Sequence, residues 1–191
     1  MKRFRRDGVK IKSSAQIDAM KAAGHLSAQA LEVVGSFIRP GVSTAELDAV
    51  AEKCIVEAGG TPAFKGYGGF PATICASVND MVVHGIPSPD VILEDGDVVS
   101  IDTGAIVDGW VGDNAETFIV GTQGKQHLDL LSATLAAMWA GIDQAFPGNH
   151  LGDIGYAIQK VIEDAGFNVI REYSGHGIGR KMHEPPNVLN Y

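Results

Sequence analysis

The chain contains an approximate internal repeat, and this repeat is the feature that most limits the folds open to it. A proline–glycine loop, an amphipathic stretch and a closing glycine run from Pro40 to Gly59 and again from Pro147 to Gly166. Such loops and glycines are typical of the two ends of a helix. A further stretch with apolar residues at helical spacing precedes each copy. We therefore expect a duplicated chain with two helices in each half.

Strand-like segments follow the first copy of the repeat but hardly follow the second. Segments 72–78, 97–107 and 110–120 are rich in β-branched residues and are separated by turn formers. After the second copy only segment 168–179 and a short tail remain, so the second half is expected to be incomplete. Helices followed by strands in each half predict an α+β fold, in which helices cover one face of an antiparallel sheet.

The second and third strand segments flank Asp108-Gly109, a favoured two-residue hairpin turn. This turn places Asp102 opposite Ala115 and diagonal to Asp113, whereas a wider turn places the two aspartates directly opposite. In either register both carboxylates share one face of the sheet, because side chains alternate along a strand. Buried carboxylates that lie close together must share a proton or bind a cation. For Asp102 and Asp113 we favour a metal site over the alternative that they merely end turns. Asp108, in contrast, is expected to be an ordinary turn residue.

Three histidines lie in loops bounded by glycine or proline, where functional sites concentrate. His176 and His183 stand in the segment GHGIGRKMHEPP, and His84 stands in NDMVVHGIP. Imidazole and carboxylate together suit Mn, Fe, Co or Zn better than Ca or Mg. A mononuclear iron oxygenase is a weaker alternative because it needs only one carboxylate. The other histidines are expected to be ordinary polar residues: His25, His127 and His150.

Composition excludes several function classes. The net charge of −8 gives the body of the chain no nucleic-acid footprint. Residues 1–13 form a basic arm with six Lys or Arg and lack the apolar core of a signal peptide, and no apolar run approaches the roughly 18 residues of a membrane span. The two cysteines, Cys54 and Cys75, form no disulfide framework, which suggests a reducing compartment.

Three motifs, in this order, resemble those of the type I methionine aminopeptidases: SVNDMVVHGIP, then VVSIDTG with VGDNAET, then GHGIGRKMHEPP. The resemblance runs from about Ser14 to Tyr191. It implies a duplicated "pita-bread" fold over residues 14–191, with a first half at about 14–122 and a truncated second half at about 123–191. It also implies a cytoplasmic hydrolase that removes the initiator methionine from nascent polypeptides by attack of metal-activated water. A contact of the basic arm with the ribosome is a further expectation, whereas no membrane and no nucleic-acid role is required.

The resemblance also implies roles for particular residues. Two divalent ions (Co, Mn, Fe or Zn) are expected in the family site, and Asp102, Asp113 and His176 match metal ligands. His84 and His183 match the catalytic histidines that flank the scissile amide of the substrate. Four further residues match positions that line the methionine pocket of the family: Tyr67, Phe70, Cys75 and Met182. Each of them could equally be an ordinary core residue.

The sequence departs from the family pattern at two points. The last two ligands of the family, both glutamates, fall beyond Tyr191, and Glu184 does not replace them because the family already has an acidic residue there. Asn114 stands where the family often has a small or hydroxyl residue. Residues 1–191 alone are therefore expected to hold at most one divalent ion, weakly, and to be inactive. A prolidase-like or creatinase-like hydrolase and a non-catalytic binding module remain the alternatives.

Overall fold

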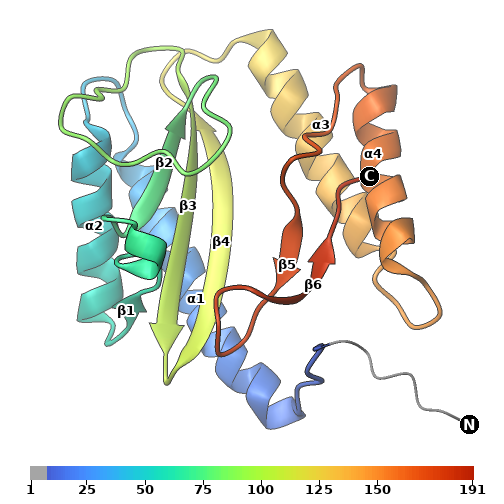
Figure 1. Cartoon of the computed structure of the whole chain (residues 1–191). Coiled ribbons are helices and arrows are strands. Elements are labelled where there is room, and N and C mark those ends of the chain that lie inside the picture. Colours follow the sequence, from blue (N-terminus) through green and yellow to red (C-terminus); the bar gives the residue numbers. More distant parts are fainter. Residues whose placement is uncertain (1–7) are drawn as a thin grey trace, which may run out of the picture. The chain divides into compact units, whose positions relative to one another are not determined.

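A computed structural model describes residues 8–191, so residues 1–7 of the expected basic arm lie outside the described part (Figure 1). The chain divides into two compact units. We call residues 11–123 and 178–182 the sheet unit, and residues 8–10, 124–177 and 183–191 the helix-pair unit. Among the described residues no helix is long and apolar enough to cross a membrane.

Two helices open the sheet unit, as the apolar spacing predicts. Helix α1 spans Ser14–Phe37 and helix α2 spans Thr44–Glu57. Each begins with a capping box of two reciprocal hydrogen bonds. The side chain of the capping serine accepts a hydrogen bond from the backbone N–H of the third residue after it. The side chain of that third residue accepts a hydrogen bond from the backbone N–H of the serine. The pairs are Ser13 with Gln16 and Ser43 with Glu46. These reciprocal bonds satisfy N–H groups that the helix itself leaves without partners, and so fix where each helix starts.

An antiparallel sheet follows, with β3 (Val98–Val107) at its centre. Strands β1 (Thr61–Pro62) and β2 (Ile74–Val78) pair with successive parts of β3 on one side, and β4 (Trp110–Ile119) pairs with it on the other. The hairpin between β3 and β4 turns at Asp108 and Gly109, with φ angles of 50° and 73°. Two positive φ angles are the signature of the tight turn that matches the twist of the strands.

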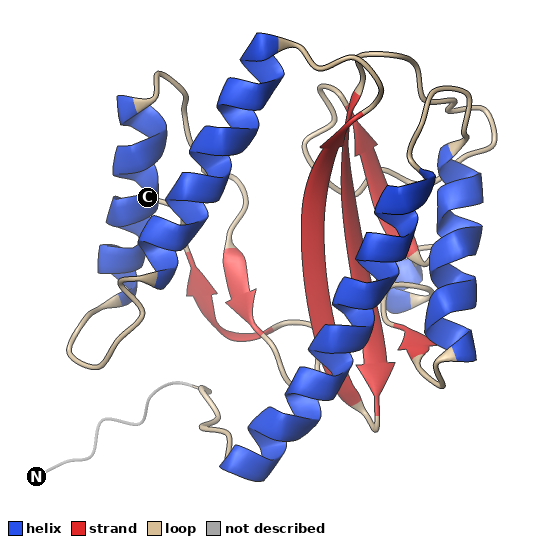
Figure 2. Cartoon of the chain, turned by 180° about the vertical axis from the view of Figure 1, so that it is seen from behind, coloured by secondary structure: helices blue, strands red, loops and turns tan. Residues whose placement is uncertain are grey.

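Helices α1 and α2 cover one face of this sheet, and Figure 2 shows α1 lying across the strands. The approach of α1 is close: a Cβ on Gly112 of β4 would lie 2.3 Å from the carbonyl carbon of Ala23. The Ser27 hydroxyl donates to the Thr103 carbonyl oxygen at 2.7 Å. The main core forms between these layers, and its buried members are Leu31, Val34, Val42, Leu47, Ala51, Ile74, Ala76, Leu93, Val99, Ile101 and Val120.

A short late segment, Ile178–Met182, also belongs to the sheet unit and docks on the tip of the β3–β4 hairpin. The Val111 N–H donates to the Gly179 carbonyl oxygen at 2.9 Å. The Arg180 guanidinium donates to the Asp108 carbonyl oxygen at 2.8 Å. The Cζ atom of Arg180 lies 4.3 Å from the centre of the Trp110 ring. This combination of a hydrogen bond and a cation–π contact fixes Met182 relative to the sheet.

The helix-pair unit contains α3 (Lys125–Ile142), α4 (Leu151–Asp164) and a two-stranded antiparallel ribbon of β5 (Gly175–Gly177) and β6 (Glu184–Val188). The two helices pack at Gly141, where an added Cβ would lie 2.7 Å from the Ile158 side chain. The strand expected over 168–179 is shorter than predicted, since only 175–177 pair.

Candidate functional site

The two aspartates of the hairpin lie on the sheet face opposite to the helices. Asp102 pairs with Ala115 and Gly104 pairs with Asp113, so the aspartates are diagonal neighbours, as the two-residue turn predicts. Burial, the negative charge of Asp113 and a hydrogen bond between the two carboxyl groups raise the pKa of Asp102 to about 7. A hydrogen bond from the Thr103 backbone N–H lowers the pKa of Asp102, but this effect is smaller than the three that raise it. Near neutral pH the pair therefore shares a proton, unless a cation replaces it.

This raised pKa predicts how the metal-free protein responds to pH. A carboxyl group whose pKa is higher in the folded than in the unfolded state stabilises the fold below its unfolded pKa, and loses that stabilisation as pH rises through the folded value. We expect Asp102 to remove at most about 4 kcal/mol of unfolding free energy between pH 4 and 7. Urea unfolding of wild type and Asp102→Asn, both metal-free, measures this. Identical pH dependence in the two proteins would contradict it.

Beside the aspartates lies an apolar cluster that includes most of the expected methionine pocket. Cys75 pairs with Asp102 across β2 and β3. Burial and the charges of Asp102 and Asp113 raise the pKa of its thiol to about 12, so the thiol is neutral. Cys75 and Met182 are buried in this cluster with Ala63, Phe64 and Val111, and the half-buried members are Phe70, Ile106 and Ile178. Tyr67, in contrast, is half exposed and not among its members.

Phe64 is the aromatic cluster member that the sequence did not lead us to expect. It lies in the glycine-rich stretch that leads into the short 3-10 helix η1 (Tyr67–Gly69). A Cβ on Gly104 would lie 2.7 Å from the Phe64 ring, so glycine at this point of β3 leaves room for the aromatic side chain. The only signal in the sequence was an aromatic residue two positions after a proline.

Helix α2 holds both ends of this glycine-rich loop. The Asp48 carboxylate accepts from the backbone N–H groups of Thr73 and Ile74 at 2.8 and 2.9 Å. At the other end the Lys65 ammonium contacts the Glu52 carboxylate at 2.6 Å. Asp48 and Glu52 are one helical turn apart, so one face of α2 holds the loop that carries Phe64 and Phe70.

The expected histidines fall in both units. His84 lies in the sheet unit, in the loop between β2 and β3, with a φ angle of 61°. His176 in β5 and His183 just before β6 belong to the helix-pair unit, where their ring centroids are 4.2 Å apart. The His176 Nδ1 lies 3.0 Å from the Gly177 carbonyl oxygen.

The donor set fits a borderline divalent ion in its chemistry. Asp102 and Asp113 offer carboxylate oxygens that a cation can bind in place of the shared proton, and His176 offers an imidazole. Within residues 8–191, however, no three His, Cys, Asp or Glu side chains form a ready group for a metal. The departure at Asn114 does not disturb the aspartates, because its side chain donates to the Gly24 carbonyl oxygen of α1, on the other sheet face.

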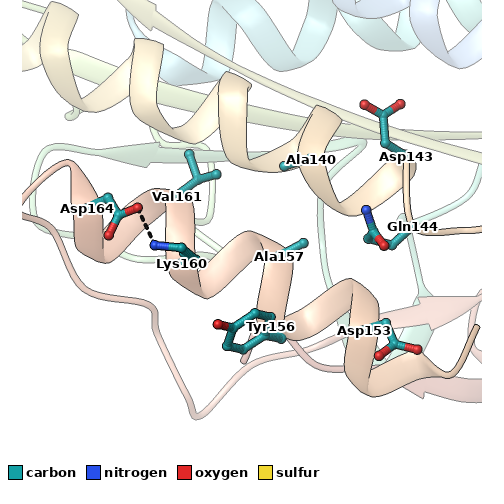
Figure 3. Close-up of a pocket in the computed structure, with 9 residues that line it drawn as sticks. All are labelled: Ala140, Asp143, Gln144, Asp153, Tyr156, Ala157, Lys160, Val161 and Asp164. Carbon is teal, nitrogen blue, oxygen red and sulfur yellow. Dashed lines mark hydrogen bonds and ion pairs between the residues drawn. The ribbon is translucent and has the colours of Figure 1, made fainter.

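A separate pocket of about 510 Å³ lies between α3 and α4 (Figure 3). None of the expected site residues lines it. Its most prominent polar contact, between the Lys160 ammonium and the Asp164 carboxylate at 2.7 Å, joins two exposed side chains one turn apart on α4. Such exposed pairs contribute little to stability or binding.

Comparison with known proteins gives a consistent result. Residues 18–191 match the sequence model of metallopeptidase family M24. A curated methionine aminopeptidase of Clostridium acetobutylicum is 44% identical over 95% of this chain and 72% of its own length. The methionine aminopeptidase of Escherichia coli strain K12 is 44% identical over 96% of this chain and 70% of its own length.

Solved structures agree with the curated relatives. The crystal structure of the methionine aminopeptidase of Rickettsia prowazekii matches with a TM-score of 0.94 and 42% identity, over 96% of this chain and 73% of that one. A prolidase of Pyrococcus furiosus matches with a TM-score of 0.84 and 25% identity, over 95% of this chain and 52% of that one. The pita-bread fold and the antiparallel sheet with helices on one face are thus confirmed.

Proposed function

The chain belongs to metallopeptidase family M24, and from this premise we propose that Asp102, Asp113 and His176 bind the divalent ions of a methionine aminopeptidase. The activity is metal-dependent removal of N-terminal methionine, as in the relatives at 44% identity. The prolidase, at 25% identity, is a less similar alternative. The observation that carries the proposal is the pair of hydrogen-bonded carboxyl groups beside an apolar cluster that contains a neutral thiol.

We propose two divalent ions, of Mn, Fe, Co or Zn, in the site of the whole enzyme. Support comes from the carboxylate pair, since two half-buried negative charges that repel each other are stabilised by cations. When bound, such ions lower the pKa of a water molecule and polarise the carbonyl group of the substrate. Asp102 and Asp113 must first give up the proton that they share, so metal affinity is expected to rise with pH.

The apolar cluster is proposed to take the methionine side chain. Cys75, Met182 and Phe70 offer a soft, polarizable lining, which suits an unbranched thioether. Tyr67, half exposed, is proposed to lie at the mouth of the pocket. Phe64, which the cluster also contains, narrows it and favours an unbranched side chain over a branched one.

The two remaining histidines are proposed to act on the scissile peptide bond. His84 would donate a hydrogen bond to the scissile amide nitrogen, which becomes the leaving amine. His183 would stabilise the carbonyl oxygen as negative charge develops on it. Each role requires only that an imidazole N–H points at the reacting atom.

The substrates, nascent polypeptides with N-terminal methionine, support a location in the cytoplasm, where synthesis starts. Residues 14–191 are proposed to be the catalytic domain, with halves at about 14–122 and 123–191. A ribosome contact by the basic arm of residues 1–13 is supported only by its six Lys or Arg.

Specificity for methionine tests this function. We define the extended enzyme as residues 1–191 followed by the C-terminal segment of the Clostridium acetobutylicum relative that lies beyond the matched region. Loaded with Mn²⁺, it is expected to release methionine from peptides whose second residue is small, and to cleave N-terminal leucine or lysine at least about 100-fold more slowly, because the pocket rejects branching and charge. Amino-acid release measured by mass spectrometry gives the rates. Equal rates on the three peptides would refute the assignment.

A further inference from the structure

The loop that carries His84 is held at both ends by β2 and β3. At its start, the Asn79 N–H donates to the Val98 carbonyl oxygen at 2.7 Å, and the Asn79 side-chain oxygen accepts from the Val98 N–H at 3.0 Å. At its end, the Gly85 carbonyl oxygen accepts from the Ala76 N–H at 2.9 Å. His84 therefore lies one residue before the second attachment point.

The backbone of His84 is in a conformation that histidine does not choose by itself. Its φ angle is 61°, in the left-handed region, which costs a non-glycine residue about 1 kcal/mol or more. The preceding loop residues do not supply this energy through burial, because Met81, Val82 and Val83 expose 52%, 50% and 38% of their surface. On the Gly85 side, in contrast, the backbone is held by hydrogen bonds to β2.

Gly85 touches β2 so closely that no other residue fits there. A Cβ added to Gly85 would lie 2.1 Å from the Ala76 carbonyl oxygen. Besides the bond from Ala76, the Gly85 N–H donates to the Ser77 hydroxyl oxygen at 3.1 Å. Both polar groups of the Gly85 backbone are thus bonded to consecutive residues of one strand.

Ser77 lies between Gly85 and the sheet face of the proposed site. It is buried, with 4% of its surface exposed, and it pairs with Ser100 of β3. Cys75, two residues earlier on β2, pairs with Asp102. Since side chains alternate along a strand, the Ser77 hydroxyl points to the sheet face that carries Asp102 and Asp113.

From these contacts we infer that Ser77 is a positioning residue, which holds His84 in its left-handed conformation through the Gly85 amide. It does not touch the substrate. The inference rests on the role of His84 proposed above. Loss of the Ser77 hydroxyl leaves the Gly85 N–H without its acceptor and lets the His84 backbone relax to a lower-energy conformation.

The first test uses residues 1–191 without metal and needs no activity. In Ser77→Ala, amide hydrogen exchange of Gly85, followed by NMR, is expected to be at least about tenfold faster than in wild type, because the N–H has lost its acceptor. Ser77→Thr keeps the hydroxyl and is expected to restore slow exchange. Ser100→Ala is the matched control: its hydroxyl bonds Thr117 at 2.8 Å on the same face, so Gly85 exchange should not change. Unchanged Gly85 exchange in Ser77→Ala would overturn the inference.

The second test asks whether Ser77 acts through His84, using the extended enzyme with Mn²⁺. We expect Ser77→Ala to lower kcat about tenfold with little change in KM, because the group that it misplaces acts on the leaving amine. In a double-mutant cycle, Ser77→Ala should have no further effect once His84→Ala is present.

The outcomes of the cycle separate this inference from the proposed function. If Ser77→Ala lowers kcat equally with and without His84, Ser77 acts as general scaffolding and the inference is wrong. If His84→Ala itself keeps the full rate, the proposed role of His84 is wrong, and with it the catalytic meaning of the Ser77 contact. A loss in His84→Ala together with full activity in Ser77→Ala overturns only the inference.

Discussion

The extended enzyme with His84→Ala is expected to lose on the order of 10²-fold or more in kcat/KM for a methionyl peptide while it keeps its metal ions. The physical reason is that His84 is proposed to hydrogen-bond the scissile amide nitrogen rather than to bind metal. Elemental analysis and initial rates, measured on the same preparation, separate the two roles.

His176→Ala is the matched comparison for this prediction, because the same side-chain change removes a proposed metal ligand. This variant should lose metal, and its rate should recover in part at high Mn²⁺ concentration, whereas added metal should not restore His84→Ala. The assigned roles would be wrong if both variants kept normal metal content and normal rates.

The hairpin is a part of the fold that local sequence rules can predict. Strand alternation predicted that Asp102 and Asp113 share one face, with a diagonal register for a two-residue turn at Asp108-Gly109 and a directly opposed one for a wider turn. The structure has the register of the two-residue turn. Helix starts were also predictable, since their signals lie within a few residues of the boundary. In both cases the determining interactions are close in sequence.

Contacts between residues distant in sequence could not be predicted in the same way. Phe64 joins the apolar cluster because Gly104, forty positions later, leaves space for its ring. Arg180 anchors the segment before His183 through the carbonyl oxygen of Asp108 and the ring of Trp110, which no local pattern of Arg180 reveals. The resemblance to a family supplied the expected ligands, but not the contacts that position them.

Strand alternation places the proposed metal ligands and the side chains that contact α1 on opposite faces of the sheet. Thr103 and Asn114 face the helices, where the Thr103 carbonyl oxygen accepts from Ser27 and the Asn114 amide donates to Gly24. Their neighbours Asp102 and Asp113 point to the opposite face. A one-residue slip of β4 would bury Asp113 against α1, so the close fit of Gly112 to Ala23 also fixes the side of the sheet on which Asp113 lies.

The polypeptide of residues 1–191, without any extension, is expected to bind at most one divalent ion, weakly, and to release no appreciable methionine. Asp102, Asp113 and His176 are three proposed ligands, and three protein ligands with water can hold one ion but are too few for two. The resemblance puts both further glutamate ligands of the family after Tyr191. Exposed apolar side chains on α3, among them Leu135, Met138, Trp139 and Ile142, add a tendency to aggregate.

Elemental analysis after dialysis against Mn²⁺ or Co²⁺, with a methionyl-peptide assay in parallel, measures both parts of this prediction. The extended enzyme is the matched control and should retain two ions and turn over. Asp102→Asn in the 191-residue polypeptide should abolish even the single ion, because one carboxylate and one imidazole leave most of the coordination sphere to water. Two tightly held ions with ordinary turnover in the 191-residue polypeptide would mean that its own residues provide ligands beyond the three proposed.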